Sequence, residues 1–597
     1  GYQVRTAFPL PVIESFTATP PQIASGETSK LAWKVSNADS VEIDMGIGTV
    51  GVSAGEVAVS PAVTVTYKLI ASNEGGPVSA LVTVGVDVPV LEPVISEFLA
   101  GNDANLADSD GNFPDWIEIH NPNAFAVDLS GHFLTDDPVE PEKWRFPEGT
   151  ALGGGGYLVV FASGTSRGPP QLHTGFRLAS SGGYLALVAP DGSSVLSEFT
   201  AYPLQRTDIS YGVSPGGGAG YFQVPTPGGQ NAAALAGFVA DTAFDVDRGF
   251  FEEPFTVAIA TSTPGATVVH TLDGSEPSMG NGFMTPPATD DSPGVARVII
   301  ERSTVLRAAA FKEGLIPTDI DTQTYLFAAD IIRQPEMDPE VVDSPAYSAE
   351  MIPALKSIRS LSIVTDEDNL FDISTGILAN THGRGIAWER PVSVEFIDPD
   401  NPAASFQVDA GLRVHGNGSR GNPKNSLRLL FRGTYGAKKL DYPLFGTDWV
   451  VQRFNTVVLR AQNANSWTTS RAEDRRVTTF LQDTFAKDSQ GAMGHPTSGS
   501  TFVHLFLNGT YWGLYNPTER PDGGFGEEHF GGEDADYDAL NRRFSVEAIS
   551  GTKVFWDDMI THSATLLDSP AEYARIAEYI DIDNLIDYML LHQYMQT

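Results

Sequence analysis

The stretch HGNGSRGNPKNSLRLLFRG, residues 415–433, decides how the C-terminal part of this chain is expected to fold. Gly416, Gly418 and Gly421 follow the spacing G-x-G-x-x-G, and an alternating pattern of apolar residues begins at Leu427. An alternation with period 2 predicts a β-strand rather than a helix. The preceding residues, AGLRVHG, also read as a strand, so the sequence predicts a strand, a glycine loop and a second strand.

This order excludes three familiar glycine-loop sites. A dinucleotide-binding fold needs a helix after its glycines, and a Walker A loop needs Lys where Asn422 stands. A nucleophile elbow needs Gly where Asn417 stands. Protein kinases cover the phosphates of ATP with a glycine loop between two strands, because glycine lets backbone N–H groups approach closely. Two interpretations remain, a phosphate-binding hairpin and a glycine-rich hairpin without a ligand.

The charge pattern sets this region apart from the rest of the chain. The protein carries 75 acidic and 37 basic side chains, a net charge of −38, which argues against nucleic acid as a partner. Residues 412–476 instead hold 12 basic and 4 acidic side chains, a net of +8. A local positive field inside an acidic protein predicts a pocket for an anion. The alternative is that these cations lie on solvated strand faces.

Length and composition bound the class of protein. A chain of 597 residues with 41% apolar residues is expected to form several globular domains. It has no cysteine, which excludes disulfides, thiolate metal sites and Cys nucleophiles. The sequence has no apolar run of about 18 residues, so no transmembrane segment is expected. The first residues do not look like a signal peptide, so export would require one that had already been removed.

Three β-rich modules are expected before the glycine hairpin. Residues 1–89 alternate in TSKLAWKVSNADSVEID and VTVTYKLIASN, with Trp33 and Tyr67 as expected core residues, and they resemble bacterial immunoglobulin-like domains. Residues 90–232 contain DSDGNFPDWIEIHNPNAFAVDLSGHFLTDD and KWRFPEGTALGGGGYLVVFASG, and they resemble the lamin-tail domain of bacterial secreted proteins. That resemblance implies an immunoglobulin-like sandwich used for binding or spacing.

The third module and the segment after it complete this part of the chain. Residues 233–328 contain ATVVHTLDGSEPS and STVLRAAAFKEGLIPTDIDTQTYLF, and they resemble the small β-sandwich at the C-terminus of chitobiases, which has an accessory role. Residues 329–354 are acidic and rich in proline, which predicts a linker.

An acidic loop in the second module is a candidate metal site. Calcium prefers six to eight hard oxygen ligands, and this loop gathers several of them, although it does not have the EF-hand spacing. The alternative is a solvated turn rich in Asx residues. The candidate calcium ligands are Asp103, Asp108, Asp110 and Asp115, with Asn105 between them.

Residues 358–597 resemble the CotH-type spore-coat protein kinases. TFVHLFLNGTYWGLYNPTER, residues 501–520, predicts two strands around an Asn508-Gly509 type I′ turn. This hairpin follows the glycine hairpin, YGAKKLDYPLFG and FNTVVLRAQNANSW in the order found in that family. The resemblance implies an atypical kinase fold, ATP with Mg²⁺ or Mn²⁺ as cofactors, and protein Ser/Thr as the substrate.

The resemblance also implies roles for individual residues. Lys424 is expected to neutralise the nucleotide phosphates, and Glu519 is expected to hold Lys424 or a metal; both are candidate catalytic residues. The alternative for Glu519 is a surface carboxylate at a strand end. The Arg-rich segment with Arg471, Arg475 and Arg476 is either part of the pocket or a solvated helix face. The expected nucleotide-binding residues are Gly416, Gly418, Ser419, Arg420, Lys424 and Arg428.

The sequence therefore predicts three all-β sandwich domains followed by a mixed α/β atypical kinase-like domain from residue 355 to 597. The family's Asp- and Asn-rich metal-binding segment is expected beyond Thr597, because DIDNLIDYMLLHQYMQT stops inside a helical pattern. Whether the chain is an enzyme therefore stays open. One hypothesis is an extracellular or bacterial cell-surface CotH-like kinase acting on a protein. The other is a non-catalytic surface or adhesion protein that uses the kinase-like domain as a scaffold and binds a cell-surface component.

Overall fold

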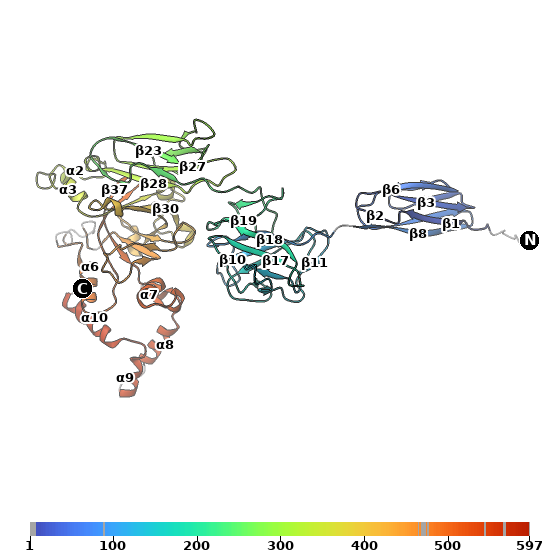
Figure 1. The fold of residues 1–597 in the computed structure, drawn as a ribbon. Helices are drawn as coiled ribbons and strands as arrows, with labels where there is room; N and C mark the ends of the chain where they lie inside the picture. The colour runs from blue at the N-terminus through green and yellow to red at the C-terminus, as the bar shows by residue number, and fades with distance from the viewer. Residues whose placement is uncertain are drawn as a thin grey trace, which may run out of the picture. The chain divides into compact units, whose positions relative to one another are not determined.

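The computed structural model describes residues 8–87, 90–463, 465–466, 473, 477–542, 545–564 and 569–595. The chain forms two compact units. Figure 1 traces the ribbon from the N-terminal strands to the C-terminal helices. The first contains Gly1–Val94, Ile119–Leu158 and Leu185–Phe199, and the second contains Ile95–Glu118, Val159–Tyr184 and Thr200–Thr597. Within the described residues, no helix is both long enough and apolar enough to span a bilayer.

The N-terminal module is a β-sandwich, as expected. Its strands alternate buried and exposed residues, and Trp33 and Tyr67 lie in its core. One sheet has the order β1-β3-β6 (Val12–Thr19, Ser29–Ser36, Ala54–Val59). The other has the order β2-β8-β7-β4-β5 (Gln22–Ala24, Gly76–Asp87, Val65–Asn73, Ser40–Ile43, Gly48–Val50).

The second module is also built only of strands. Its largest sheet has the order β16-β15-β10-β9-β19-β20 (Leu172–His173, Tyr157–Ala162, Asp115–His120, Val94–Leu99, Ser210–Val213, Ala219–Phe222). A four-stranded sheet has the order β13-β12-β17-β18 (Trp144–Arg145, Phe133–Thr135, Gly183–Val188, Val195–Tyr202), and β11 pairs with β14 (Val127–Asp128, Ala151–Leu152).

The third module is a sandwich whose core draws residues from both of its sheets, for example Val257 and Leu306. The first sheet has the order β21-β23-β26 (Thr242–Phe244, Phe255–Thr261, Val295–Ile300). The second has the order β22-β28-β27-β24-β25 (Gly249–Phe251, Asp321–Phe327, Thr304–Phe311, Thr267–Thr271, Phe283–Thr285).

The segment expected to be a linker is folded. It contains the short helices α1 (Ala328–Ile331), α2 (Pro339–Val342) and α3 (Met351–Leu355). Their buried residues Ile331, Val342 and Leu355 join Leu326 and Phe506 in one apolar core. Because this segment is acidic and rich in proline, its few apolar residues did not indicate a folded element. They attach the third module to the barrel that follows.

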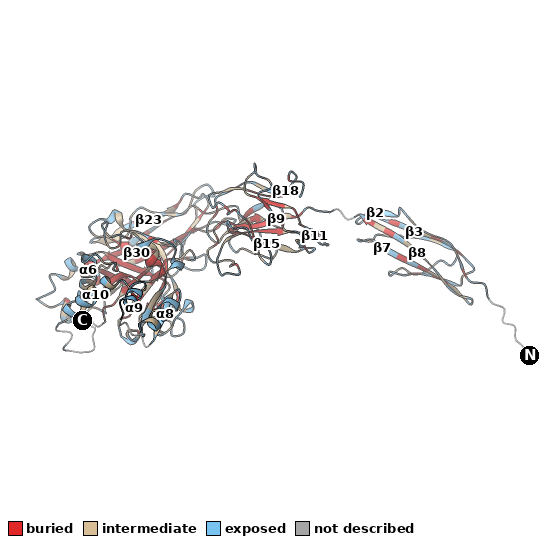
Figure 2. Cartoon of the chain, turned by 90° about the horizontal axis from the view of Figure 1, so that it is seen from below, coloured by how far each residue is buried: buried red, intermediate tan, exposed pale blue. Residues whose placement is uncertain are grey.

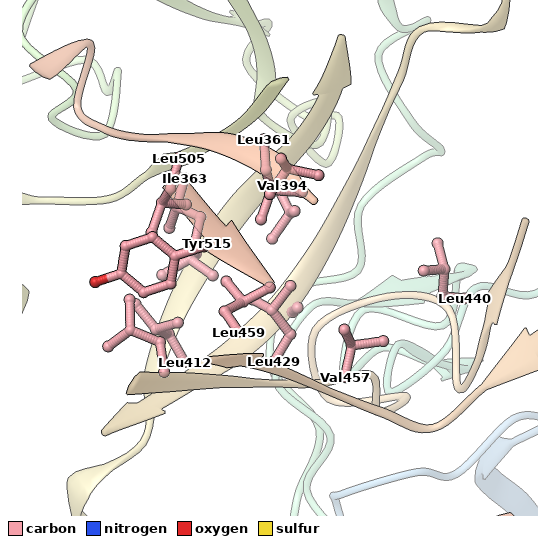
Figure 3. Packing of buried hydrophobic residues seen from close by; sticks show 14 of the residues in the cluster. Leu361, Ile363, Val394, Leu412, Leu429, Leu440, Val457, Leu459, Leu505 and Tyr515 are labelled. Carbon is pink, nitrogen blue, oxygen red and sulfur yellow. The ribbon is translucent and has the colours of Figure 1, made fainter. Parts of the chain in front are cut away.

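The C-terminal module is built around a closed barrel with the order β29-β30-β31-β32-β35-β37-β36. Its apolar interior includes Leu361, Leu412, Leu429, Leu459 and Tyr515 (Figure 3). The strands are Ser360–Val364, Arg390–Ile397, Phe406–His415, Ser426–Leu430, Thr456–Arg460, Thr510–Glu519 and Val503–Leu507. Parallel pairing of β29 with β36 closes the barrel.

Helices and two short hairpins complete this module, so the expected mixture of helix and strand is confirmed. Asn508 and Gly509 both have positive φ between β36 and β37, as a type I′ turn requires. The helices α8 and α10 are largely exposed (Figure 2). The helices are α4 (Glu367–Phe371), α6 (Gln482–Ala492), α7 (Gly523–Phe530), α8 (Val554–Ser563), α9 (Pro570–Ile576) and α10 (Ile582–Met595). The hairpins are β33-β34 (Leu440–Asp441, Arg453–Phe454) and β38-β39 (Ala539–Arg542, Val546–Ser550).

Candidate functional site

The outer face of the barrel wall carries the candidate site. Arg413 of β31 lies opposite Arg428 of β32, which lies opposite Val458 of β35, which lies opposite Thr518 of β37. Residues directly opposite each other on antiparallel strands share a face. His415 lies two residues from Arg413 and so shares that face as well. The alternating apolar residues, such as Leu412 and Leu429, point into the barrel core.

Two adjoining cavities lie on this face, and together they are called the cationic cleft below. The first has a volume of about 310 Å³, and its charged lining residues are Arg384, Arg413, Arg420, Arg428, Arg520 and Glu547. The second has a volume of about 440 Å³, and its charged lining residues are Arg460, Lys487, Glu519 and Arg520. Both cavities are lined by His415, Gly416 and Arg520.

Most cations of the cleft already have a protein partner, but Arg428 does not. Arg413 pairs with the buried Glu389. Asp483 of α6 pairs with Arg460 at 2.6 Å and with Lys487 at 2.8 Å. Arg428, in contrast, makes no hydrogen bond or ion pair with the residues that the structure describes. Its guanidinium is therefore free to take an anion.

His415 lies at the junction of the two cavities, and its pKa reflects the environment there. Burial, together with the positive charges of Arg520, Arg420 and Arg460, lowers this pKa to about 4. The imidazole is therefore neutral near pH 7, and it contributes hydrogen-bonding groups rather than charge.

The glycine loop is held in place by Arg420, which was expected to bind phosphate. Arg420 is 7% exposed. Its guanidinium donates to the carbonyl oxygens of Gly416 and Val414 (2.6 Å each), Thr381 (2.5 Å) and Gly383 (2.9 Å). These bonds use its donors to fix the loop, so Arg420 is a structural residue of the cleft wall.

Gly416 is the position in this loop where glycine is required. Its φ is +105°, and a Cβ atom there would lie 2.4 Å from the Oγ of Ser419. Added Cβ atoms at Gly418 and Gly421 would meet nothing within 4 Å. The glycine spacing therefore reflects one strained position and two open ones.

Lys424 lies outside the cleft. Its Nζ donates to the carbonyl oxygen of Leu514 at 2.7 Å and lies 4.5 Å from the centre of the Tyr515 ring. Burial lowers the pKa of Lys424 to about 8.

The expected contact between Lys424 and Glu519 is absent. The carboxylate of Glu519 accepts from the backbone N–H of Gly499 at 2.6 Å, and it lies 3.2 Å from Trp449 Nε1 and 3.1 Å from His529 Nε2. The physical reason is the strand between them. Leu514 and Glu519 are five residues apart on β37, which is about 16 Å at 3.3 Å per residue.

The structure thus brings together part of the predicted set. Gly416, Ser419, Arg420, Arg428 and Glu519 line the cleft, whereas Gly418 and Lys424 do not. Arg471, Arg475 and Arg476 lie outside the described residues. Sequence reasoning missed Arg384, Arg413, His415, Arg460, Lys487 and Arg520. Period 2 in AGLRVHG could have identified Arg413 and His415, since both share the outward face with Arg428.

The donors of the cleft fit a phosphate group better than a metal ion. Guanidinium groups give charge-assisted hydrogen bonds to phosphate oxygens. Within the described residues, no three His, Asp or Glu side chains are grouped in a way that could hold a metal. Glu519 and Glu547 line different cavities of the cleft.

The acidic loop of the second module is occupied by internal partners. Asp103 pairs with Lys438 at 2.5 Å, and Asp110 pairs with Arg167. The carboxylate of Asp108 accepts from the backbone N–H groups of Asp110 and Asn112, and that of Asp115 accepts from those of Gly101 and Leu178. These contacts favour the Asx-turn interpretation, and the calcium hypothesis stays open to test.

Comparison with known proteins places three of the modules in families. The model described as CotH kinase protein matches residues 412–597, Lamin Tail Domain matches residues 90–200, and Chitobiase/beta-hexosaminidase C-terminal domain matches residues 246–322. No curated protein matches the chain.

Several solved structures of serial immunoglobulin-like domains are similar in part. An I-band fragment of titin is 10% identical, covers 54% of this chain and 99% of its own length, and has a TM-score of 0.16. Extracellular domains 3–5 of Drosophila OTK are 10% identical, cover 51% of this chain and 93% of their own length, and have a TM-score of 0.21. An ectodomain fragment of ICAM-5 is 9% identical, covers 69% of this chain and 96% of its own length, and has a TM-score of 0.17.

These TM-scores are too low to support any argument from structural likeness. The family matches and the observed sheets agree on the order of the modules. The chain is a multidomain protein in which residues 412–597 match the CotH kinase protein family, after stretches that match a lamin tail domain and a chitobiase/β-hexosaminidase C-terminal domain.

Proposed function

We propose that the cationic cleft is the ATP-phosphate site of a CotH-type protein kinase domain that transfers a phosphoryl group to protein Ser or Thr. The observation that carries this proposal is Arg428, an unpartnered guanidinium beside a glycine loop in an otherwise acidic chain. Arg384, Arg413 and Arg520 line the same cavity and add positive charge around the phosphate oxygens.

Each group of the cleft has a task that its own chemistry supports. Arg428 binds phosphate oxygens directly, whereas Arg413 contributes charge while Glu389 holds its position. The neutral imidazole of His415 offers one donor and one acceptor at the junction of the cavities. A divalent metal would neutralise charge on the transferred phosphoryl group. The described residues supply no ligand set for such a metal.

The modules before the barrel suggest where this activity takes place relative to the cell. Three β-modules in series are typical of proteins that bind or space at a cell surface, and we place the protein outside the cell or at a bacterial cell surface. The same modules favour a second candidate function, a surface or adhesion protein in which the kinase-like domain serves as a scaffold. In both cases the partner is a protein or another cell-surface component.

Titration of ATP with Mg²⁺ or Mn²⁺ into the chain tests the first function. Arg428→Gln removes one charge-assisted contact, which costs about 1.5–3 kcal/mol, or roughly ten- to a hundredfold in affinity. Lys424→Met is expected to leave the affinity nearly unchanged, because Lys424 binds Leu514 and lies outside the cleft. The exposed Arg302→Gln in the third module is the matched charge control.

The outcomes separate the two functions. Weaker binding by Arg428→Gln alone supports the phosphate site. A loss with Lys424→Met of the same size as with Arg428→Gln, at an unchanged unfolding temperature, would place the nucleotide elsewhere. No ATP binding by any of the proteins would favour the scaffold.

A further inference from the structure

A second cleft lies in the second compact unit, between the chitobiase-like sandwich and the barrel. It has a volume of about 310 Å³, at the lower end of the range for small-molecule sites. The sandwich contributes Glu276, Arg307 and Asp319 to its lining, and the barrel contributes Ser393, Asp409 and Tyr435. Strand β28 of the sandwich lies beside β30 of the barrel (Figure 1). Neither the kinase chemistry nor the cationic cleft uses this site.

A polar clamp joins the sandwich to the barrel beside this cleft. Glu395 of β30 accepts from the backbone N–H of Thr324 at 2.9 Å, and Gln407 of β31 accepts from that of Thr322 at 2.6 Å. Arg248 lies 3.5 Å from the fully buried Glu395. These contacts hold the two walls together, so the cleft has a defined shape.

The next residue pair on the same face opens into the cleft. Ser393 lies directly opposite Asp409 in the pairing of β30 with β31, two residues along from Glu395 and Gln407. Residues two apart on a strand share a face. The pair Glu395 and Gln407 binds β28, whereas the pair Ser393 and Asp409 lines the cleft.

Two buried polar atoms at this cleft have no hydrogen-bond partner among the described residues. They are Ser393 Oγ and Arg307 Nε, in side chains that are 2% and 6% exposed. The rest of the Arg307 guanidinium is anchored, since Nη1 donates to the carbonyl oxygen of Gly274 at 2.9 Å. An unpaired buried polar group is costly, and most such groups in proteins have a partner.

The charged side chains that line the cleft limit the chemical classes of ligand that it could bind. An anion would face the carboxylates of Asp409, Glu276 and Asp319. An organic cation would pair with those carboxylates but leave Arg307 Nε facing a like charge. No group of three metal-ligating side chains is found here among the described residues.

A hydroxyl group both donates and accepts a hydrogen bond and carries no charge. Several hydroxyls on one ring would donate to the carboxylates and accept from Arg307 and Ser393. Burial raises the pKa of Asp409 to about 6, with a hydrogen bond from Gln407 acting against it. Near this pH the Asp409 side chain can therefore donate as well as accept.

We propose that this cleft binds a neutral polyhydroxylated ligand, such as one ring of a saccharide, with Ser393, Asp409 and Arg307 as its principal hydrogen-bonding partners. The half-buried Tyr435 and the flanking Pro391 and Ile320 offer apolar surface to the C–H groups of such a ring. Because the ligand would contact both modules, its binding would also stabilise their attachment.

Ligand-observed saturation-transfer NMR on the full chain tests this site, with glucose, galactose, mannose and myo-inositol as probes. At least one probe is expected to show saturable binding that ATP does not displace. Methylammonium chloride is the counter-probe for a cation site. Saturable binding of methylammonium alone, or displacement of the sugar by ATP, would overturn the assignment.

Three variants assign any binding to this cleft. Ser393→Ala removes a hydroxyl without a protein partner, so the unfolding temperature should stay unchanged while the affinity falls roughly two- to tenfold. Asp409→Asn should weaken binding about tenfold or more. Asp400→Asn removes an exposed carboxylate from the connection between β30 and β31 and should have no effect. Equal affinity in all three variants, or no saturable binding of any probe, would mean that the cleft holds only water.

Discussion

The cationic cleft of the barrel and a pair of buried carboxylates in the lamin tail domain both gather like charges, but they resolve the repulsion differently. In the cleft, Asp483 and Glu389 neutralise several cations and leave Arg428 charged beside a cavity. In the lamin tail domain, Glu97 of β9 and Glu118 of β10 are fully buried on neighbouring strands, and no cation among the described residues pairs with them.

The carboxylate pair is held by neutral donors. Glu97 accepts from Ser210 Oγ and from the N–H and Oγ of Thr226. Glu118 accepts from Ser96 Oγ at 2.6 Å and from the N–H of Gly228 at 2.5 Å. Burial, with a smaller contribution from the charge of Glu97, raises the pKa of Glu118 to about 7 although these hydrogen bonds lower it. The comparison teaches that like charges can be neutralised by built-in counter-ions, whereas burial among dipoles alone raises the pKa of both carboxylates.

The largest expected effect concerns pH and the carboxylate pair. Because the folded-state pKa of Glu118 is raised from 4.5 to about 7, its contribution to stability is fully present below about 4.5 and is lost as pH rises through 7. The loss is on the order of 2–3 kcal/mol. Calorimetry from pH 5 to pH 8 should show the lamin tail transition moving to lower temperature.

Glu118→Gln, which imitates the protonated side chain, should flatten this dependence, whereas Glu148→Gln on the surface of the same module should not. A transition that keeps its pH dependence in Glu118→Gln would show that the pair is ionised when folded, and the contrast with the cleft would fail.

A smaller effect is expected from the counter-ions of the cleft. Asp483→Asn releases Arg460 and Lys487, which strengthens the positive field around a bound phosphate. Removing one partly exposed carboxylate is worth about 1 kcal/mol, so ATP should bind roughly fivefold more tightly at low salt. Isothermal titration calorimetry measures this change.

Asp488→Asn on the same helix has no ion pair among the described residues and serves as the control. Added NaCl should reduce the gain, because salt screens exposed charges. Unchanged or weaker ATP binding by Asp483→Asn would show that the carboxylate organises the cleft more than it neutralises it.

The smallest expected effect is that of calcium on the acidic loop. Asp103, Asp108, Asp110 and Asp115 already have internal partners, so neither calcium nor EDTA should shift the lamin tail transition. A bound ion at 100 times its dissociation constant would add about 2.7 kcal/mol, which calorimetry detects readily. A clear rise with calcium that EDTA reverses would restore the calcium hypothesis for this loop.

Local features of the chain were enough to predict its fold class and to point to some residues that line the cleft. Period-2 alternation predicted the strands, and the Asn508-Gly509 pair predicted the hairpin turn. Arg428, a predicted nucleotide-binding residue, lines the cationic cleft, and its role there stays a prediction. The strands and the turn depend on residues close together in the chain, because the pleat and the turn are set by neighbouring φ and ψ angles.

The partners of the charged side chains, in contrast, depend on the tertiary structure of the closed barrel. Arg420 and Lys424 are near neighbours in one loop, yet one binds carbonyls of its own loop and of residues 381–383 while the other binds Leu514, ninety residues away. Arg384, Lys487 and Arg520 reach the cleft from distant segments. A long basic side chain pairs with the acceptors that the fold brings within a few ångströms. The spacing of residues along the chain does not determine that distance.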